Sequence, residues 1–245
     1  MRQFAENEVR PEARACDEAA APDPDVLAAA HELGLVANAL PEAHGGGGER
    51  SAVSGCLVAE ELAWGDLSLA LAILSPSLLG LPVADHGTPE QQAAVLPALL
   101  GDAFAPGSLA WVEPRFGFDP FHPHTTAKRD GSDFVLDGRK CFVPWQDGLE
   151  HVLVVASEDG GLAGFLVPTN AKGLTAEREA NMGLRALPTA ELALAGVRVP
   201  ASGRLGGDAG ADLANVLARG RVALASCAVG VAGEAYEVWR EYTKE

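Results

Sequence analysis

The chain contains 245 residues, of which 48% are hydrophobic, and its formal net charge at pH 7 is −16. This apolar content is enough to build a large core, so the composition excludes a disordered chain. The acidic charge argues against nucleic acids and anionic membranes as partners, because both bind basic surfaces. We therefore expect a soluble, cytoplasmic protein that binds neither.

The cysteines and the apolar segments narrow the class further. No two cysteines form a CxxC pair, so neither a zinc site nor a disulfide framework is predicted. The chain starts with polar residues, which does not predict a secretory signal. The most apolar stretch, Leu67 to Ala84, is interrupted by serines and prolines, so no membrane span is expected. Four free thiols are predicted: Cys16, Cys56, Cys141 and Cys227.

The first 102 residues are rich in Ala, Leu and Glu and carry the start and stop signals of short packed helices. Asp23 is a good N-cap, and Pro24 follows it at the first helical position, where its missing N–H costs nothing. The pattern predicts a helix from Val26 to Leu33.

A second helix start is predicted at Thr88. Its hydroxyl can accept from the amide of Gln91 while the Gln91 side chain returns to the Thr88 amide, as in a capping box. Pro97 is expected to stop or kink this helix, with Gly101 in the turn beyond.

From about Gly107 to Val199, short apolar runs alternate with turn residues, which predicts an antiparallel β unit. Asp137-Gly138 lies between residues 134–136 and 141–143 and suits a hairpin turn. Residues 152–156 and 162–167 flank a second acidic turn. A meander is the simplest topology for these strands.

After Gly210 apolar residues recur at helical spacing from Leu213 to Tyr242. Gly230 and Gly233 are small enough for close helix contacts. A lone amphipathic helix of this length leaves its apolar face uncovered, so we expect a further helical domain to pack on it. An exposed helical tail is the alternative.

The run NMGLRALPTAELALAGVRVPASGRLGG, residues 181–207, resembles a segment that ends the β-domain of acyl-CoA dehydrogenases. The family pattern is close to MG-x-R-x-S-x-T-x-x-L-x-F-x-x-V-x-VP-x-x-x-x-LG, with Leu187 here in place of the serine and Leu194 in place of the phenylalanine. Residues 33–48, 87–97 and 221–236 are similar to further family segments in the same order. The matching positions are Met182, Gly183, Arg185, Thr189, Leu192, Val197, Val199, Pro200, Leu205 and Gly206.

The resemblance implies an α+β fold with three parts: an N-terminal helical domain at residues 1–106, a middle antiparallel β-domain at 107–207, and at 208–245 the first helix of an incomplete C-terminal helical domain. It also implies α,β-desaturation of an acyl-CoA thioester, with hydride transfer to FAD, in a homo- or hetero-oligomer formed through the helical domains. The protein would position the flavin and supply a base.

Two segments correspond to the family's flavin-facing loops. In residues 109–119 the usual threonine is Val112 and the usual serine is Phe118, and in residues 138–146 the usual threonine is Pro144. These changes remove three hydroxyl groups, so FAD binding is expected to be weakened or lost. The residues implied at the flavin are Leu109, Trp111, Val112, Gly117, Phe118, Phe142, Val143 and Pro144. For Phe142 and Val143 the alternative is that they are core strand residues only.

Substrate contacts are implied at Phe118, Ser157 and Arg221, although an exposed turn serine and a solvated arginine are plain alternatives. The family's catalytic glutamate lies in the C-terminal domain in most members, so no catalytic residue is expected in this chain. His122 and His124 have no third ligand nearby in sequence, and no metal site is predicted.

Two functions remain open from the sequence. The first is an acyl-CoA dehydrogenase whose C-terminal part is missing or is supplied by a second polypeptide. The second is a non-catalytic relative, a binding or scaffold subunit with a degenerate flavin site, paired with an active homologue. The lost hydroxyls at Val112, Phe118 and Pro144 favour the second.

Overall fold

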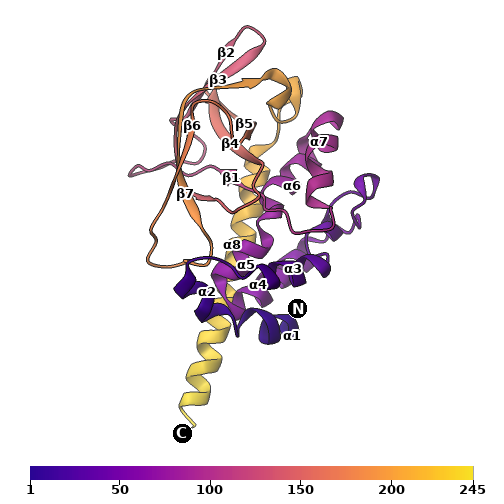
Figure 1. Ribbon diagram of the computed structural model, residues 1–245, viewed down its shortest axis with the longest axis vertical. Helices are drawn as coiled ribbons and strands as arrows, with labels where there is room; N and C mark the ends of the chain where they lie inside the picture. The colour runs from indigo at the N-terminus through magenta and orange to yellow at the C-terminus, as the bar shows by residue number, and fades with distance from the viewer. Residues whose placement is uncertain (245) are drawn as a thin grey trace.

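In the computed structural model, which describes residues 1–244, a group of helices and a curled β-sheet lie side by side (Figure 1). The long helix α8 (Leu213–Tyr242) runs along both, and its last turns project beyond the rest of the chain. The order of helices, sheet and final helix confirms the predicted α+β architecture.

The helix predicted from Val26 to Leu33 is observed as α3, Pro24–Glu32. The Asp23 side chain accepts a hydrogen bond from the backbone N–H of Asp25 at 2.7 Å and starts the predicted helix. Short 3-10 and π-helical turns link the α-helices. These are α1 (Arg2–Phe4), α2 (Ala13–Ala19), α3 (Pro24–Glu32), α4 (Ala52–Gly65), α5 (Leu67–Leu74), α6 (Pro76–His86) and α7 (Pro89–Leu99).

The predicted capping box starts α7: the Gln91 amide donates to the Thr88 hydroxyl, and the Thr88 amide donates to the Gln91 side chain. The same side chain also donates to the carbonyls of Ser202 and Arg204, both at 2.7 Å, so it joins the helices to the end of the sheet. The prediction for Pro97 was only partly right. The helix runs two residues past it, to Leu99, so Pro97 lies in the last turn, where it removes one intrahelical hydrogen bond without ending the helix at once.

Seven strands form one sheet in the order β1-β4-β2-β3-β7-β6, with β5 paired to β4. The predicted hairpin around Glu158 to Gly161 is confirmed, since β4 and β5 pair antiparallel across it. The strands are β1 (Leu109–Ala110), β2 (Thr126–Asp130), β3 (Asp133–Pro144), β4 (His151–Glu158), β5 (Gly161–Pro168), β6 (Leu174–Arg178) and β7 (Thr189–Pro200).

The hairpin predicted at Asp137-Gly138 is wrong. Strand β3 continues through this pair with an irregularity in its register, and the chain turns earlier, at Gly131, where φ is +64°. Gly138 is required for close packing instead, because a Cβ there would lie 2.5 Å from the hydroxyl oxygen of Thr125. The Asp137 carboxylate accepts from the backbone N–H of Gly196 at 2.8 Å.

The predicted meander is also wrong. β1 and β2 both pair parallel with one edge of β4, at Leu153–Val154 and at Ser157, and β5 takes the other edge; the remaining pairs are antiparallel. The backbone between β1 and β2 is a long loop, residues 111–125, which carries Trp111, Val112, Gly117 and Phe118 of the predicted site.

Separate apolar clusters fill the sheet and the helical region. The helical cluster includes Ala186 and Leu187 from the β-domain side and Cys227 from α8, so it also joins the parts of the fold. Leu187 replaces the serine of the family pattern, and its 7% exposure shows that it fills this apolar core. All four cysteines are free, as predicted.

Helix α8 packs on α4 along one face only. Gly230 makes this contact possible, because a Cβ at that position would lie 2.0 Å from the Glu60 carbonyl oxygen. The matching prediction for Gly233 is wrong, since a Cβ there would meet nothing within 4 Å. The buried residues of α8 are Leu213, Cys227 and Gly230.

The opposite face of α8 is apolar and exposed. Its positions alternate in steps of four and three residues, which is the spacing of a helix-packing stripe. We call this stripe the outer face: Ala218, Val222, Ala225, Val229, Ala232, Tyr236 and Trp239, all exposed.

Two helical stretches in residues 1–244 have the length and apolar character of a membrane span, Leu67–His86 and Leu213–Tyr242. In the first, 61% of the most apolar window is buried, because α5 and α6 lie within the helical core. In the second only 11% is buried, so its apolar surface is not explained by packing within the described residues.

Candidate functional site

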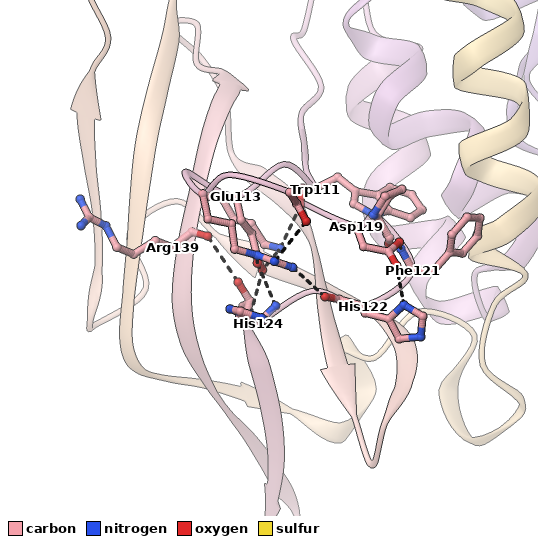
Figure 2. A network of polar contacts seen from close by, with 12 residues as sticks. Trp111, Glu113, Asp119, Phe121, His122, His124 and Arg139 are labelled. Carbon is pink, nitrogen blue, oxygen red and sulfur yellow. Dashed lines mark hydrogen bonds and ion pairs between the residues drawn. The ribbon is translucent and has the colours of Figure 1, made fainter.

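The long loop after β1 is organised around one carboxylate, that of Glu113 (Figure 2). The backbone N–H groups of His124 and Thr125 each donate to it at 2.8 Å, so the residue that opens the loop also holds its far end. The Lys140 ammonium, from β3, donates to the same carboxylate and to the Trp111 carbonyl, both at 3.1 Å. Glu113 therefore joins three segments of backbone.

The charged side chains of Lys140 and Glu113 lie in the interior of the protein. The side chains of Lys140 and Glu113 are 0% and 4% exposed. Burial alone would raise the pKa of Glu113, but hydrogen bonds from Thr125 and His124 and the charge of Lys140 lower it to about 2. Burial lowers the pKa of Lys140 to about 8, against the attraction of Glu113. Both groups are charged near pH 7, and the pair is intact there.

Arg115 closes the loop across its middle. Its guanidinium contacts the Glu113 carboxylate at 3.2 Å, donates to the His122 carbonyl at 2.9 Å and lies 5.6 Å from the centre of the Phe118 ring. The Trp111 indole N–H donates to the Pro120 carbonyl at 2.8 Å. The loop from Glu113 to His124 is thus fastened by its own side chains.

The sequence-predicted residues of the first segment differ in exposure. Leu109 is half-buried on β1, and Trp111 is only 6% exposed, so its side chain belongs to the core. Val112 is 39% exposed and Gly117 sits at a turn with φ of +65°. Phe118 packs partly against the apolar cluster that contains Trp111 and Leu213.

The second segment places an aromatic ring at the surface. Phe142 has a φ of +53° and is 61% exposed, because the register of β3 against β7 shifts between Lys140 and Val143. The backbone N–H of Phe142 donates to the Glu179 carboxylate at 2.9 Å, which fixes this uncommon conformation. Val143 is fully buried in the sheet core.

Pro144 ends β3 half-buried, and its carbonyl accepts from the Ser108 hydroxyl at 2.7 Å. The two segments meet directly, since the Cys141 N–H donates to the Val112 carbonyl at 2.9 Å. Val112 and Phe142 are therefore exposed apolar side chains on neighbouring strands of backbone.

The substrate-facing residues are less closely grouped. Ser157 is half-buried at the end of β4, where its N–H donates to the Thr125 carbonyl at 2.8 Å. Arg221, exposed on α8, lies 5.9 Å from the centre of the Phe121 ring. His122 contacts the Asp119 carboxylate at 2.7 Å, and both side chains are open to solvent.

Sequence inspection missed three parts of this arrangement. Glu113 and Lys140 both lie in the family motifs, but the sequence does not show that they pair with each other. The available signal was only that Lys140 lies between core strand residues, since a buried lysine needs a carboxylate partner. No sequence pattern indicated that Arg115 bonds across the loop, or that Glu179 accepts a hydrogen bond from the Phe142 amide.

The side chains at the two segments do not fit FAD in the way that the resemblance implies. The positions that should offer hydroxyl groups present Val112 and Pro144, and Phe118 turns toward the core. Arg115 already bonds the loop carbonyl and carboxylate within its reach. What remains for a planar ring is an apolar contact at Phe142.

Comparison with known proteins matches this architecture. The model for the acyl-CoA dehydrogenase N-terminal domain matches residues 1–102, and that for the middle domain matches residues 108–197. The chain is 32% identical over 254 residues to the probable acyl-CoA dehydrogenase FadE25 of Mycobacterium tuberculosis, covering 100% of this chain and 64% of that protein. It is 33% identical over 257 residues to the probable acyl-CoA dehydrogenase YngJ of Bacillus subtilis, covering 100% and 67%.

Among solved structures, a glutaryl-CoA dehydrogenase from Mycobacterium smegmatis in complex with FADH2 superposes with a TM-score of 0.86 at 32% identity. The match covers 99% of this chain and 63% of that one. The chain thus spans about two thirds of the length of these relatives. With both domain models matched in order and the fold shared, the chain belongs to the acyl-CoA dehydrogenase family.

Proposed function

We propose that this chain is a non-catalytic acyl-CoA dehydrogenase-like subunit that binds an acyl-CoA or supports an active partner, with a flavin site that has degenerated. The observation that carries the proposal is the self-closed loop from Glu113 to His124. The Glu113 carboxylate, the Arg115 guanidinium and the Trp111 indole N–H all bond to groups of this loop. Val112 and Pro144 offer no hydroxyl to a flavin.

The chain retains features suited to an acyl-CoA. Ser157 and Arg221 lie at positions that correspond to substrate contacts in the family, and Arg221 extends from α8 toward Phe121. No residue of this chain is assigned as the base, and no metal is part of the proposal. We also propose domain boundaries near residues 106 and 207. A cytoplasmic location is proposed too, and the acidic composition supports it.

A pair of measurements tests this function. The protein is purified in excess FAD, desalted, and examined for flavin absorbance; it is then titrated with octanoyl-CoA, with free coenzyme A as the control. We expect a colourless protein whose affinity for the thioester exceeds that for coenzyme A. Retention of stoichiometric FAD would contradict the proposal, as would the absence of thioester binding by the chain together with its partner.

The second candidate is a flavin-dependent acyl-CoA dehydrogenase whose base is supplied outside residues 1–244. The specific observation in its favour is Phe142, an exposed aromatic ring held in a fixed conformation by Glu179 at the segment that corresponds to the second flavin loop. When bound, FAD would accept the hydride. The absorbance measurement separates this candidate from the first.

The outer face of α8 is the reason to propose that further helices associate with this chain. A helix that packs on one side only and carries an unbroken apolar stripe on the other is stable in water when further helices cover the stripe. We propose that helices outside residues 1–244 do so, either from a continuation of the same polypeptide or from a second one.

A further inference from the structure

The two exposed segments of the candidate site are joined by one buried ion pair. Lys140 lies on β3, immediately before Cys141 and Phe142, whereas Glu113 opens the loop that follows β1. The Lys140 ammonium reaches Glu113 and the Trp111 carbonyl, both at 3.1 Å, and its side chain is 0% exposed.

We propose that Lys140 is a positioning residue, whose ammonium sets the loop from Glu113 to His124 against the segment from Cys141 to Pro144 and keeps both preformed. Only the identity of the ligand that these segments face rests on the proposed function. The contacts by which Lys140 holds the two segments together do not depend on it.

The physical reason is the cost of separating the pair. A buried carboxylate or ammonium without its partner is much less stable than a buried pair, so each charge restrains the backbone that carries the other. Glu113, at the start of its loop, passes this restraint to the far end through the N–H groups of His124 and Thr125. The neighbouring Arg139 pairs instead with Glu191, where both side chains reach solvent.

Cys141 offers a direct report on this fastening. Its side chain is 5% exposed, and burial raises the pKa of its thiol to about 11, so it is unreactive while the segment is closed. Cys16 and Cys227 are buried in the helical core, remote from this ion pair in the packing of the chain. They serve as internal controls for unfolding of the whole molecule.

The experiment measures the rate of N-ethylmaleimide labelling at each cysteine by peptide mass spectrometry, together with hydrogen exchange of amides 112–124. Lys140→Met is expected to speed the labelling of Cys141 at least about tenfold more than that of Cys16 and Cys227, a factor equivalent to about 1.4 kcal/mol. Exchange of the loop amides should rise in parallel. Arg139→Met, the matched control, should change neither.

Two results would overturn the inference: Cys141 labelling within about twofold of the wild type, or an equal rise at all three cysteines, which would mark Lys140 as a general stabilising residue. If Lys140→Met does not fold, Glu113→Gln removes one charge with little change of shape, and the same criteria apply to it. These measurements need no ligand, so failure of FAD or octanoyl-CoA binding tests the proposed function separately.

Discussion

The loop from Glu113 to His124 and helix α8 differ in how far their side chains find partners within residues 1–244. The loop carries many polar groups, and most of them find partners within it. Helix α8 carries an apolar stripe that finds no partner within residues 1–244. The difference indicates that the chain's unmet requirement is for apolar helical contact, whereas its polar loop is already complete.

The largest expected effect concerns the polar side of this comparison. Glu113→Ala should lower the free energy of unfolding by about 3 kcal/mol at pH 7, because it leaves the Lys140 ammonium buried without a carboxylate. Urea unfolding followed by tryptophan fluorescence measures it. A loss below about 1 kcal/mol would show that the buried pair contributes little.

The same pair predicts the dependence on acid. The folded pKa of Glu113 is lowered to about 2 from an ordinary value of 4.5, so the unfolded chain binds the proton first as the pH falls. The contribution of Glu113 is therefore fully present above about pH 4.5 and is lost between there and pH 2. Unfolding curves of the wild type and Glu113→Gln should converge over this window, and parallel curves would refute the assignment.

Next in size is the close contact of α8 with α4 at Gly230. Gly230→Ala should lower the free energy of unfolding by about 1–3 kcal/mol, because its Cβ would meet the Glu60 carbonyl at 2.0 Å. Gly233→Ala is the matched control in the same helix. It should raise stability by about 0.5–1 kcal/mol, since alanine favours a helix and its Cβ meets nothing. Equal effects of the two variants would mean that the α4–α8 contact is not close.

On the outer face of α8 the expected effect is on association rather than folding. Val229→Asp should change the free energy of unfolding by less than about 0.5 kcal/mol, because Val229 is 56% exposed. It should reduce self-association of the isolated chain in light scattering, with Asn215→Asp on the polar side of the helix as control. A wild-type chain that is already a uniform monomer would contradict this view of the stripe.

The smallest effect should come from a surface ion pair. Arg198 contacts Asp130 and Asp133, but its side chain is 59% exposed, so water screens the interaction. Arg198→Met should cost less than about 0.5 kcal/mol in thermal unfolding. A loss comparable to that of Glu113→Ala would remove the distinction between buried and exposed charge pairs in this chain.

Particular residues show how far sequence patterns reach. Asp23 and the pair Thr88 and Gln91 start helices as predicted, because an N-cap depends on neighbours within three residues. The prediction at Asp137-Gly138 was wrong, because this glycine is needed for a close contact with Thr125, thirteen residues earlier, and not for a turn. The meander failed for a similar reason, since β4 pairs with β1 and β2, which precede it, and not with its chain neighbour β3.

The candidate site divides in the same way. Val112, Phe118 and Pro144 could be identified as lost hydroxyls from their place in the motifs, and the exposure of Phe142 agrees with a surface role. The closing contacts of Arg115 and the acceptor at Glu179 could not be predicted, because they depend on the path of a loop and on a register shift in β3.

By itself the sequence determined the family, the order of helices and strands, and the absence of the family pattern's hydroxyl residues at positions 112, 118 and 144, because these depend on residue identity and local spacing. Only the tertiary structure decided that Lys140 pairs with Glu113, that Leu187 fills a helical core and that Gly230 lets α8 pack closely on α4. Each of these contacts joins residues far apart in the chain, and burial, which no local pattern records, sets its energy.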